Sequence, residues 1–76
     1  MPPKRQSYRD IADDIEARIH RGEYQPGQEL PSAAGWAEIY SVSKSTAERA
    51  LMVLRERGLT EGVQGLGTFV AERRGK

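Results

Sequence analysis

Apolar residues recur at intervals of three and four near the start of the chain, which is the spacing of one face of a helix. This face consists of Tyr8, Ile11, Ala12, Ile15 and Ile19. The pattern predicts a first helix from about Ser7 to His20 or Arg21, ended by Gly22. Acidic side chains occupy its early and middle turns and basic ones its last turn, as the helix dipole favours.

The next segment predicts a turn and then a second, short helix. Pro26-Gly27 is a turn signal, because proline presets the first turn position and glycine tolerates a positive φ. Gln28–Leu30 is expected to be a short extended segment. Ser32 is then placed to cap a helix over about Ala33–Tyr40. The apolar contact of this helix is expected from Trp36, Ile39 and Tyr40.

A third helix is predicted between a capping serine, Ser43, and a terminating glycine, Gly58. Its buried stripe is expected to be Ala47, Ala50, Leu51 and Leu54. The opposite face offers Ser45, Glu48, Arg49 and Met52. Because only a few residues separate it from the second helix, the two have the spacing of a helix-turn-helix.

The spacing of the apolar residues is no longer helical after Gly58. Leu59–Val63 and Thr68–Val70 contain β-branched or aromatic residues and flank the glycine-containing loop Gln64–Gly67, which predicts a β-hairpin. The chain is therefore expected to be mainly α with a small β-hairpin, in the order of a winged helix-turn-helix of three helices and a β wing.

Composition excludes several classes of protein. The chain has 76 residues, no cysteine and one histidine. The lack of cysteine excludes disulfides and thiolate metal sites, and a single histidine in so small a domain gives little support for a catalytic triad. No apolar run approaches the ~20 residues of a membrane span, and the amino terminus does not resemble a secretory signal. The acids of the first helix lack the spacing of a calcium loop, and the glycines of the hairpin lack the rest of a dinucleotide fingerprint. A cytoplasmic protein without metal, cofactor or enzymatic activity is expected.

Charge is distributed unevenly, although the net charge is only +1. Residues 1–41 carry five Lys or Arg against seven Asp or Glu, whereas residues 42–76 carry seven against four. Such an asymmetry is expected if one face of the protein meets a polyanion. An ordinary solvated surface is the alternative.

Three segments resemble the amino-terminal DNA-binding domain of GntR-type bacterial transcription regulators, especially its HutC-like branch. They are IxxGxxxPGxxLPS at Ile19–Ser32, VSxxTxxxAL at Val42–Leu51 and GxGTFV at Gly65–Val70. The resemblance covers about residues 7–71, which are expected to form the DNA-binding domain. Residues 1–6 are expected to be a flexible arm, and residues 72–76 a basic tail.

The resemblance implies which residues contact DNA. In the family the second helix of the motif lies in the major groove, and the wing tip enters the adjacent minor groove. The residues carried over to this sequence are Ser43, Lys44, Ser45, Thr46, Glu48, Gln64, Gly65 and Leu66. The helix-capping Ser32, Arg49 beside Glu48, and Gly67 beside the wing tip complete the expected DNA-binding set. Hydroxyls and helix amino termini suit phosphate oxygens, and a glycine-bearing turn lets backbone approach a narrow groove.

The chain also departs from the family pattern. Ala33-Ala34 replaces the usual Glu-Arg after LPS, which removes an arginine that commonly contacts DNA. Glu48 stands where the family favours arginine; it either accepts a hydrogen bond from a cytosine amino group or pairs with Lys44 one helical turn away. Arg49 is placed to replace part of the lost positive charge. The operator is therefore expected to differ in its central bases from those of typical relatives.

The leading hypothesis is a regulator, expected to be a repressor, that binds double-stranded DNA in a sequence-specific manner. A winged-helix module that docks another protein is the alternative from a different class. Relatives normally carry a larger effector-binding domain, and no small-molecule effector site is evident in this chain, which is either a short regulator or an excised domain. A weak homodimer or monomer that pairs on a pseudopalindromic operator is expected.

Overall fold

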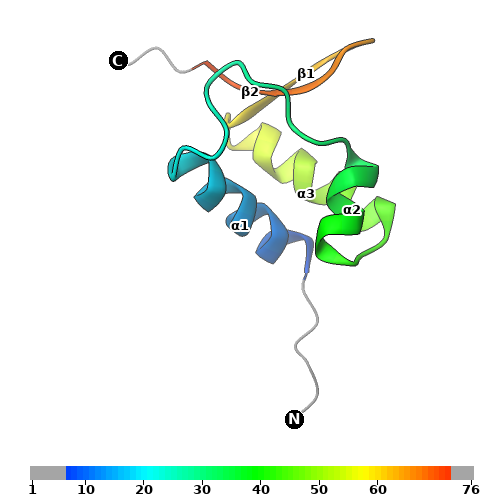
Figure 1. Ribbon diagram of the computed structural model, residues 1–76. Coiled ribbons are helices and arrows are strands. Elements are labelled where there is room, and N and C mark those ends of the chain that lie inside the picture. The colour runs from blue at the N-terminus through cyan, green and yellow to red at the C-terminus, as the bar shows by residue number, and fades with distance from the viewer. Residues whose placement is uncertain (1–6, 73–76) are drawn as a thin grey trace.

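The computed structural model describes residues 7–72, so the expectations for residues 1–6 and for most of the tail, residues 73–76, lie outside it. In the described part, three helices, α1 (Tyr8–His20), α2 (Ala33–Tyr40) and α3 (Lys44–Glu56), are followed by two strands, β1 (Thr60–Val63) and β2 (Gly67–Val70). The hairpin lies at one end of the helical layer (Figure 1). The predicted winged helix-turn-helix order is confirmed.

Serine caps start all three helices. The sequence predicts this for Ser32 and Ser43, whereas Ser7 is expected only as the approximate start of the first helix. Ser7 forms a reciprocal capping box with Asp10, in which Ser7 Oγ accepts from the Asp10 backbone N–H and Asp10 Oδ2 accepts from that of Ser7, both at 3.2 Å. Ser32 and Ser43 each accept one N–H from the first turn of α2 and α3. The boundaries of these helices are therefore set by local hydrogen bonds rather than by distant contacts.

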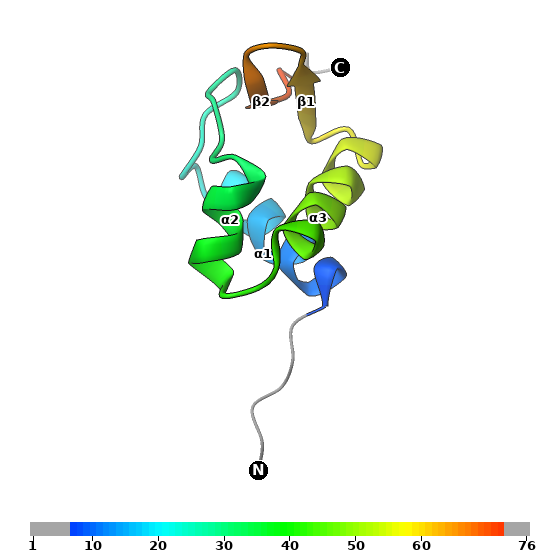
Figure 2. The same ribbon diagram turned by 90° about the vertical axis from the view of Figure 1, so that its right-hand side faces the viewer.

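The central element is α3, which packs against α1, α2 and β1 (Figure 2). It meets the other two helices through Ala47, Ala50 and Leu54, which are fully buried. The small alanine side chains let the neighbouring helix backbones approach closely. Leu51, predicted to belong to this buried stripe, is only half-buried because it lies at the edge facing the hairpin.

Trp36 anchors α2 in the core and is fully buried, as predicted. Its ring lies between those of Tyr24 and Tyr40, with centroid distances of 6.0 and 5.9 Å. The expectation that Ile39 joins this contact is wrong, since Ile39 is 49% exposed. Trp36 and Tyr40 are four residues apart and share the core face, and on so short a helix Ile39 falls on the flank beyond reach of α1 and α3.

The hairpin is extended by the segment before α2. Strands β1 and β2 are antiparallel, with Val63 opposite Gly67. The predicted Pro26-Gly27 turn forms, and the residues after it pair with the outer edge of β2 through an isolated bridge between Glu29 and Phe69. The expected extended segment is thus confirmed, and it ties the base of the hairpin to the helix-turn-helix. Strand β2 begins one residue earlier than predicted, at Gly67.

The turn between α2 and α3 contains an unusual backbone conformation. Ser41 ends α2 with φ 57° and ψ 48°, in the left-handed region that non-glycine residues seldom adopt. Its N–H and that of Val42 return to the last carbonyls of α2. This conformation turns the chain directly into Ser43, which caps α3.

Candidate nucleic-acid interface

The amino terminus of α3 presents a cluster of three hydroxyls. Ser43 Oγ accepts from the Thr46 backbone N–H at 3.2 Å and donates to Thr46 Oγ1 at 2.9 Å. Ser43 Oγ also lies 3.2 Å from Ser45 Oγ. Ser43, Lys44 and Ser45 are exposed and Thr46 is half-buried. The remaining N–H groups of the first turn, with the positive end of the helix dipole, make this end of α3 suited to a phosphate.

The exposed face of α3 divides into two sides. Glu48 lines a hollow between α3 and the hairpin, together with Thr60 and Thr68. Arg49, one residue further, points toward α1 and holds its guanidinium carbon 5.7 Å from the centre of the Tyr8 ring. The two side chains therefore serve different sides of the helix, because consecutive residues are ~100° apart.

The predicted pair between Lys44 and Glu48 is not formed, since neither residue takes part in any ion pair within residues 7–72. Glu48 is instead part of the hollow that faces the hairpin. The Glu48 side chain is exposed there.

The hairpin turn is exposed and built on glycine. Gly65 has φ +83°, and the Leu66 N–H returns to the Val63 carbonyl to close the turn. Gly67 has φ +131°, and a Cβ there would lie 2.9 Å from Glu29 Oε2. Gly67 is thus needed where the hairpin meets the segment before α2, whereas Gln64, Gly65 and Leu66 form the tip.

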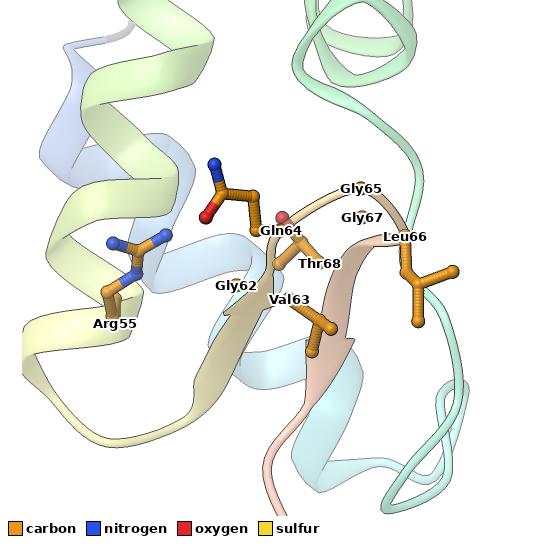
Figure 3. Close-up of a pocket in the computed structure, with 8 residues that line it drawn as sticks. All are labelled: Arg55, Gly62, Val63, Gln64, Gly65, Leu66, Gly67 and Thr68. Atoms are coloured by element: carbon orange, nitrogen blue, oxygen red, sulfur yellow. The ribbon is translucent and has the colours of Figure 1, made fainter.

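The two faces of the hairpin differ in chemistry. Figure 3 shows Gln64 on the side that faces α3, together with Arg55, whereas Val63 and Leu66 point away from that helix. Leu66 is 68% exposed. The polar side of the wing therefore adjoins the polar face of α3. Gln64 lines a hollow at the hairpin and Glu48 lines a second hollow against α3, and Arg55 and Thr68 line both.

Ion pairs separate the arginines of the domain into two groups. Arg57 contacts Asp13 at 2.9 Å and Glu16 at 2.7 Å, and Arg18 and Arg21 pair with acids on or just after α1. Hydrogen bonds to these two acids raise the pKa of Arg57. Among the described residues, the cations outside such pairs are Arg9, Lys44, Arg49 and Arg55. Three of these belong to α3, so the free positive charge is concentrated on the helix that carries the hydroxyl cluster.

Acids of α1 form ion pairs with neighbouring cations. Asp13, Asp14 and Glu16 are partners of Arg57, Arg18 and His20. No group of three potential metal ligands occurs in residues 7–72. None of the helices in that range is long and apolar enough to cross a bilayer.

Most predicted site residues lie on this candidate interface, and one cation beside them, Arg55, was not among those predicted. Ser32 caps α2 by accepting from the Gly35 N–H, and its exposed hydroxyl can still donate. Arg55 was not predicted, although it lines the hollow between α3 and the hairpin. The signal was present, because Glu48, Met52 and Arg55 follow the same three- and four-residue spacing.

An exposed helix of a helix-turn-helix beside a glycine-tipped β wing defines a winged helix-turn-helix domain of the DNA-binding transcription regulators. Residues 7–70 match the family described as "Bacterial regulatory proteins, gntR family". The chain therefore belongs to the GntR family.

Curated relatives are regulators of the same kind. The chain is 43% identical over 67 residues to the mannosyl-D-glycerate transport/metabolism system repressor MngR of Escherichia coli, covering 88% of this chain and 28% of the relative. It is 38% identical over 69 residues to the histidine utilization repressor of Klebsiella aerogenes, covering 91% and 29%. The chain thus spans less than a third of the length of either relative.

Solved structures share the fold. The AraR DNA-binding domain, in a crystal structure of its complex with operator ORE1, superposes with a TM-score of 0.80 and 35% identity, covering 93% of this chain and 83% of that one. A GntR family transcriptional regulator from Listeria monocytogenes superposes with a TM-score of 0.86 and 27% identity, covering 96% and 64%.

Proposed function

We propose that this domain represses transcription by binding a duplex operator, with α3 in the major groove and the hairpin tip in the adjacent minor groove. The observation that carries the proposal is a continuous exposed surface. It runs along α3 from Ser45 through Glu48 and Met52, and it continues across two adjoining hollows, both lined by Arg55, to Gln64. An α-helix fits the major groove, and a glycine-bearing turn fits the narrower one.

The residues have distinct proposed roles. Ser43, Ser45 and Thr46, with the first N–H groups of α3, bind phosphate oxygens, while Ser32 does the same at the start of α2. Lys44 and Arg49 supply positive charge on either side of the helix. Glu48 reads a base by accepting from a cytosine amino group. Gln64, Gly65, Leu66 and the adjoining Gly67 place the wing against the minor groove.

One domain presents one recognition helix and one wing, so a single copy makes few phosphate contacts. Two copies on a pseudopalindromic operator, with half-sites about one helical turn apart, supply the missing affinity. Such a protein acts at the bacterial nucleoid. Occlusion of a promoter by the bound pair is the proposed means of repression, and the names of MngR and the histidine utilization repressor support this sign of regulation.

A protein-docking role is the competing function, because Met52 and Leu66 expose 60% and 68% of their surface beside the polar groups. The two functions differ in their response to salt. Phosphate contacts make log affinity fall linearly with log salt concentration, by about 0.9 for each phosphate neutralised on B-DNA. A docking surface without phosphate contacts lacks this steep dependence.

The test is selection of bound duplexes from a random-sequence library, followed by salt titrations of binding. We expect enrichment of a sequence with two-fold symmetry, a steep salt dependence, and weaker binding by Ser45→Ala and Gln64→Ala. Arg21→Ala is the matched control, since Arg21 lies at the end of α1 and pairs with Glu23 at 2.8 Å. Absence of any enriched sequence, or affinity that does not respond to salt, would exclude this function.

A further inference from the structure

Arg55 is a cation held in the hollow between α3 and the hairpin. It follows Glu48 and Met52 along one face of α3, and it lines two adjoining hollows, one against the helix and one at the hairpin. Within the described part of the chain it forms no ion pair, unlike Arg57, the C-cap residue of α3, which pairs with acids of α1. Glu48 is two helical turns away, or about 10 Å along the axis, so the acid of this face does not neutralise it.

Gly62 makes room for the Arg55 guanidinium against strand β1. A Cβ at residue 62 would overlap Nη2 of Arg55 and lie 3.2 Å from its Cζ. The backbone of Gly62 has no positive φ that would by itself demand glycine. The Arg55 guanidinium, on the same side of the hairpin as Gln64 (Figure 3), occupies the space that a side chain at residue 62 would enter. Because it is the end of a flexible side chain, it would shift if that space were filled.

The position of this arginine corresponds to a definite feature of a duplex. A major groove and its neighbouring minor groove are separated by one sugar-phosphate backbone. If α3 occupies the first and the hairpin tip the second, that backbone crosses the hollow between them. Arg55 is the cation that lines this hollow among the described residues. A guanidinium offers two parallel N–H donors, which match the oxygens of a phosphate.

We propose that Arg55, seated over Gly62, binds a phosphate of the DNA strand that passes between α3 and the hairpin. This inference rests on the proposed function and names a contact that the resemblance to the family did not supply. It also offers a physical compensation for the arginines that Ala34 and Glu48 replace. The positive charge lost at the front of the motif is supplied three turns along α3 instead.

The experiment compares the wild-type chain with Arg55→Ala, Arg55→Lys, Gly62→Ala and the double variant Arg55→Ala/Gly62→Ala. Binding is measured by fluorescence anisotropy between about 50 and 200 mM salt on two duplexes, one selected from a random library and one of scrambled sequence. Arg21→Ala is the control for loss of one positive charge outside the hollow. Thermal melts of each variant establish that the domain is folded at the temperature of the titration.

Arg55→Ala is expected to weaken binding about tenfold at low salt, as for loss of one charge-assisted hydrogen bond. The loss should be similar on both duplexes, and the salt slope should fall by about 0.9. Arg55→Lys should keep the slope with part of the affinity. Gly62→Ala should displace the guanidinium and weaken binding, but it should add nothing in the Arg55→Ala background, because both changes remove the same contact.

Two outcomes would overturn the inference while leaving the proposed function intact. One is wild-type binding with a steep salt slope that Arg55→Ala does not change. The other is a loss confined to the selected duplex, which would make Arg55 a base-reading residue. If the wild-type chain binds neither duplex in a salt-dependent way, the proposed function fails and the Arg55 contact fails with it.

Discussion

The Tyr40 hydroxyl of α2 donates a hydrogen bond to Oδ2 of Asp14 in α1 at 2.5 Å, across 26 positions of sequence. Asp14 Oδ2 also accepts from Nε of Arg18 at 3.4 Å, and the Arg18 guanidinium carbon lies 5.6 Å from the centre of the Tyr40 ring. The first helix of the helix-turn-helix is thereby joined to α1 by a polar contact at the edge of the core. Because α2 packs on α3, this contact helps to set the position of the recognition helix.

Removal of the Tyr40 hydroxyl should destabilise the domain. Tyr40→Phe keeps the ring against Trp36 and loses only the hydrogen bond, so the free energy of unfolding should fall by about 1 kcal/mol. Tyr24→Phe is the matched control, because Tyr24 also packs on the Trp36 ring, at 6.0 Å. Chemical denaturation of both variants measures the difference. Equal stability of the two would show that the contact contributes nothing.

Stability should fall in acid as Asp14 is protonated. The hydrogen bond from Tyr40 is the largest cause that lowers the pKa of Asp14 from 3.8, and Arg18 adds to it. A lowered folded-state pKa means that the carboxylate stabilises the fold above the unfolded value, and that this contribution is lost as the pH falls below about 4. Urea denaturation from pH 2 to 6 should show a smaller loss in Asp14→Asn than in the wild type. An identical pH profile in that variant would contradict the assignment.

Tyr40 should also titrate at high pH. Burial, followed by its hydrogen bond to the Asp14 carboxylate, raises the pKa of Tyr40 from 10.0 to about 12. The neutral phenol therefore contributes stability that is complete below pH 10 and is lost as the pH rises toward 12. Phenolate absorbance of the folded protein should show a late phase that Tyr40→Phe removes. If the late phase persisted in Tyr40→Phe, it would not come from Tyr40, and the prediction would be wrong.

Glycine at position 41 should stabilise the turn of the motif. Ser41 holds a left-handed conformation, φ 57° and ψ 48°, which disfavours side chains with a Cβ. Ser41→Gly should raise the free energy of unfolding by about 0.5 kcal/mol, since the relief of strain exceeds the added entropy of the unfolded chain. Ser41→Val should lower it. The order of the three denaturation midpoints tests the prediction, and a less stable glycine variant would contradict it.

Lys44 and Glu48 should affect DNA recognition in different ways. Lys44→Ala should weaken binding to all duplexes to a similar extent and reduce the salt slope, because a phosphate contact carries no sequence information. Glu48→Ala should instead change the preferred bases, with a discrimination of about 1–3 kcal/mol lost at the position it reads. Repeating the duplex selection with each variant separates the two roles. Recovery of the common family consensus by the wild-type chain would argue against the assignment of Glu48.

The free protein should be a monomer or a weak dimer that pairs on its operator. We expect sedimentation of the free chain to give a species of about 8.5 kDa, the mass of one copy. Addition of a selected duplex with two half-sites should yield a complex with two copies, whereas one half-site should bind weakly. A tight dimer in the absence of DNA would contradict this prediction.

Sequence patterns that span only a few residues were sufficient to predict most of the helices and strands. The bounds of α2 agree with the prediction from Ser32 and the apolar pattern, and the strands differ from their predicted limits by one residue at their starts. Capping serines, turn glycines and apolar spacing act through neighbours in sequence, so they can be recognised without knowing the fold. The same apolar spacing wrongly predicted that Ile39 is buried, because spacing alone does not show whether a residue at the side of a short helix contacts another element.

The interface was predicted less completely, because its residues act through partners distant in sequence. The exposed hydroxyls of α3 and the glycine tip could be assigned from local pattern and from the family resemblance. That Arg57, the C-cap of α3, is paired with Asp13 and Glu16, while Arg55 in the last turn is not, depends on which elements surround α3. Which groups Glu48 and Arg49 face depends likewise on the positions of the hairpin and of Tyr8.

The sequence by itself therefore determined the identity and order of the helices and strands, the capping residues and the membership of the family. Only the tertiary structure decided which cations remain unpaired, which side of the wing faces α3, and that Gly62 makes room for Arg55. The physical reason is the sequence separation of the interacting groups. Capping and turn hydrogen bonds join residues that are close in sequence, whereas the ion pairs of Arg57 require acids that tertiary packing brings from a distant element.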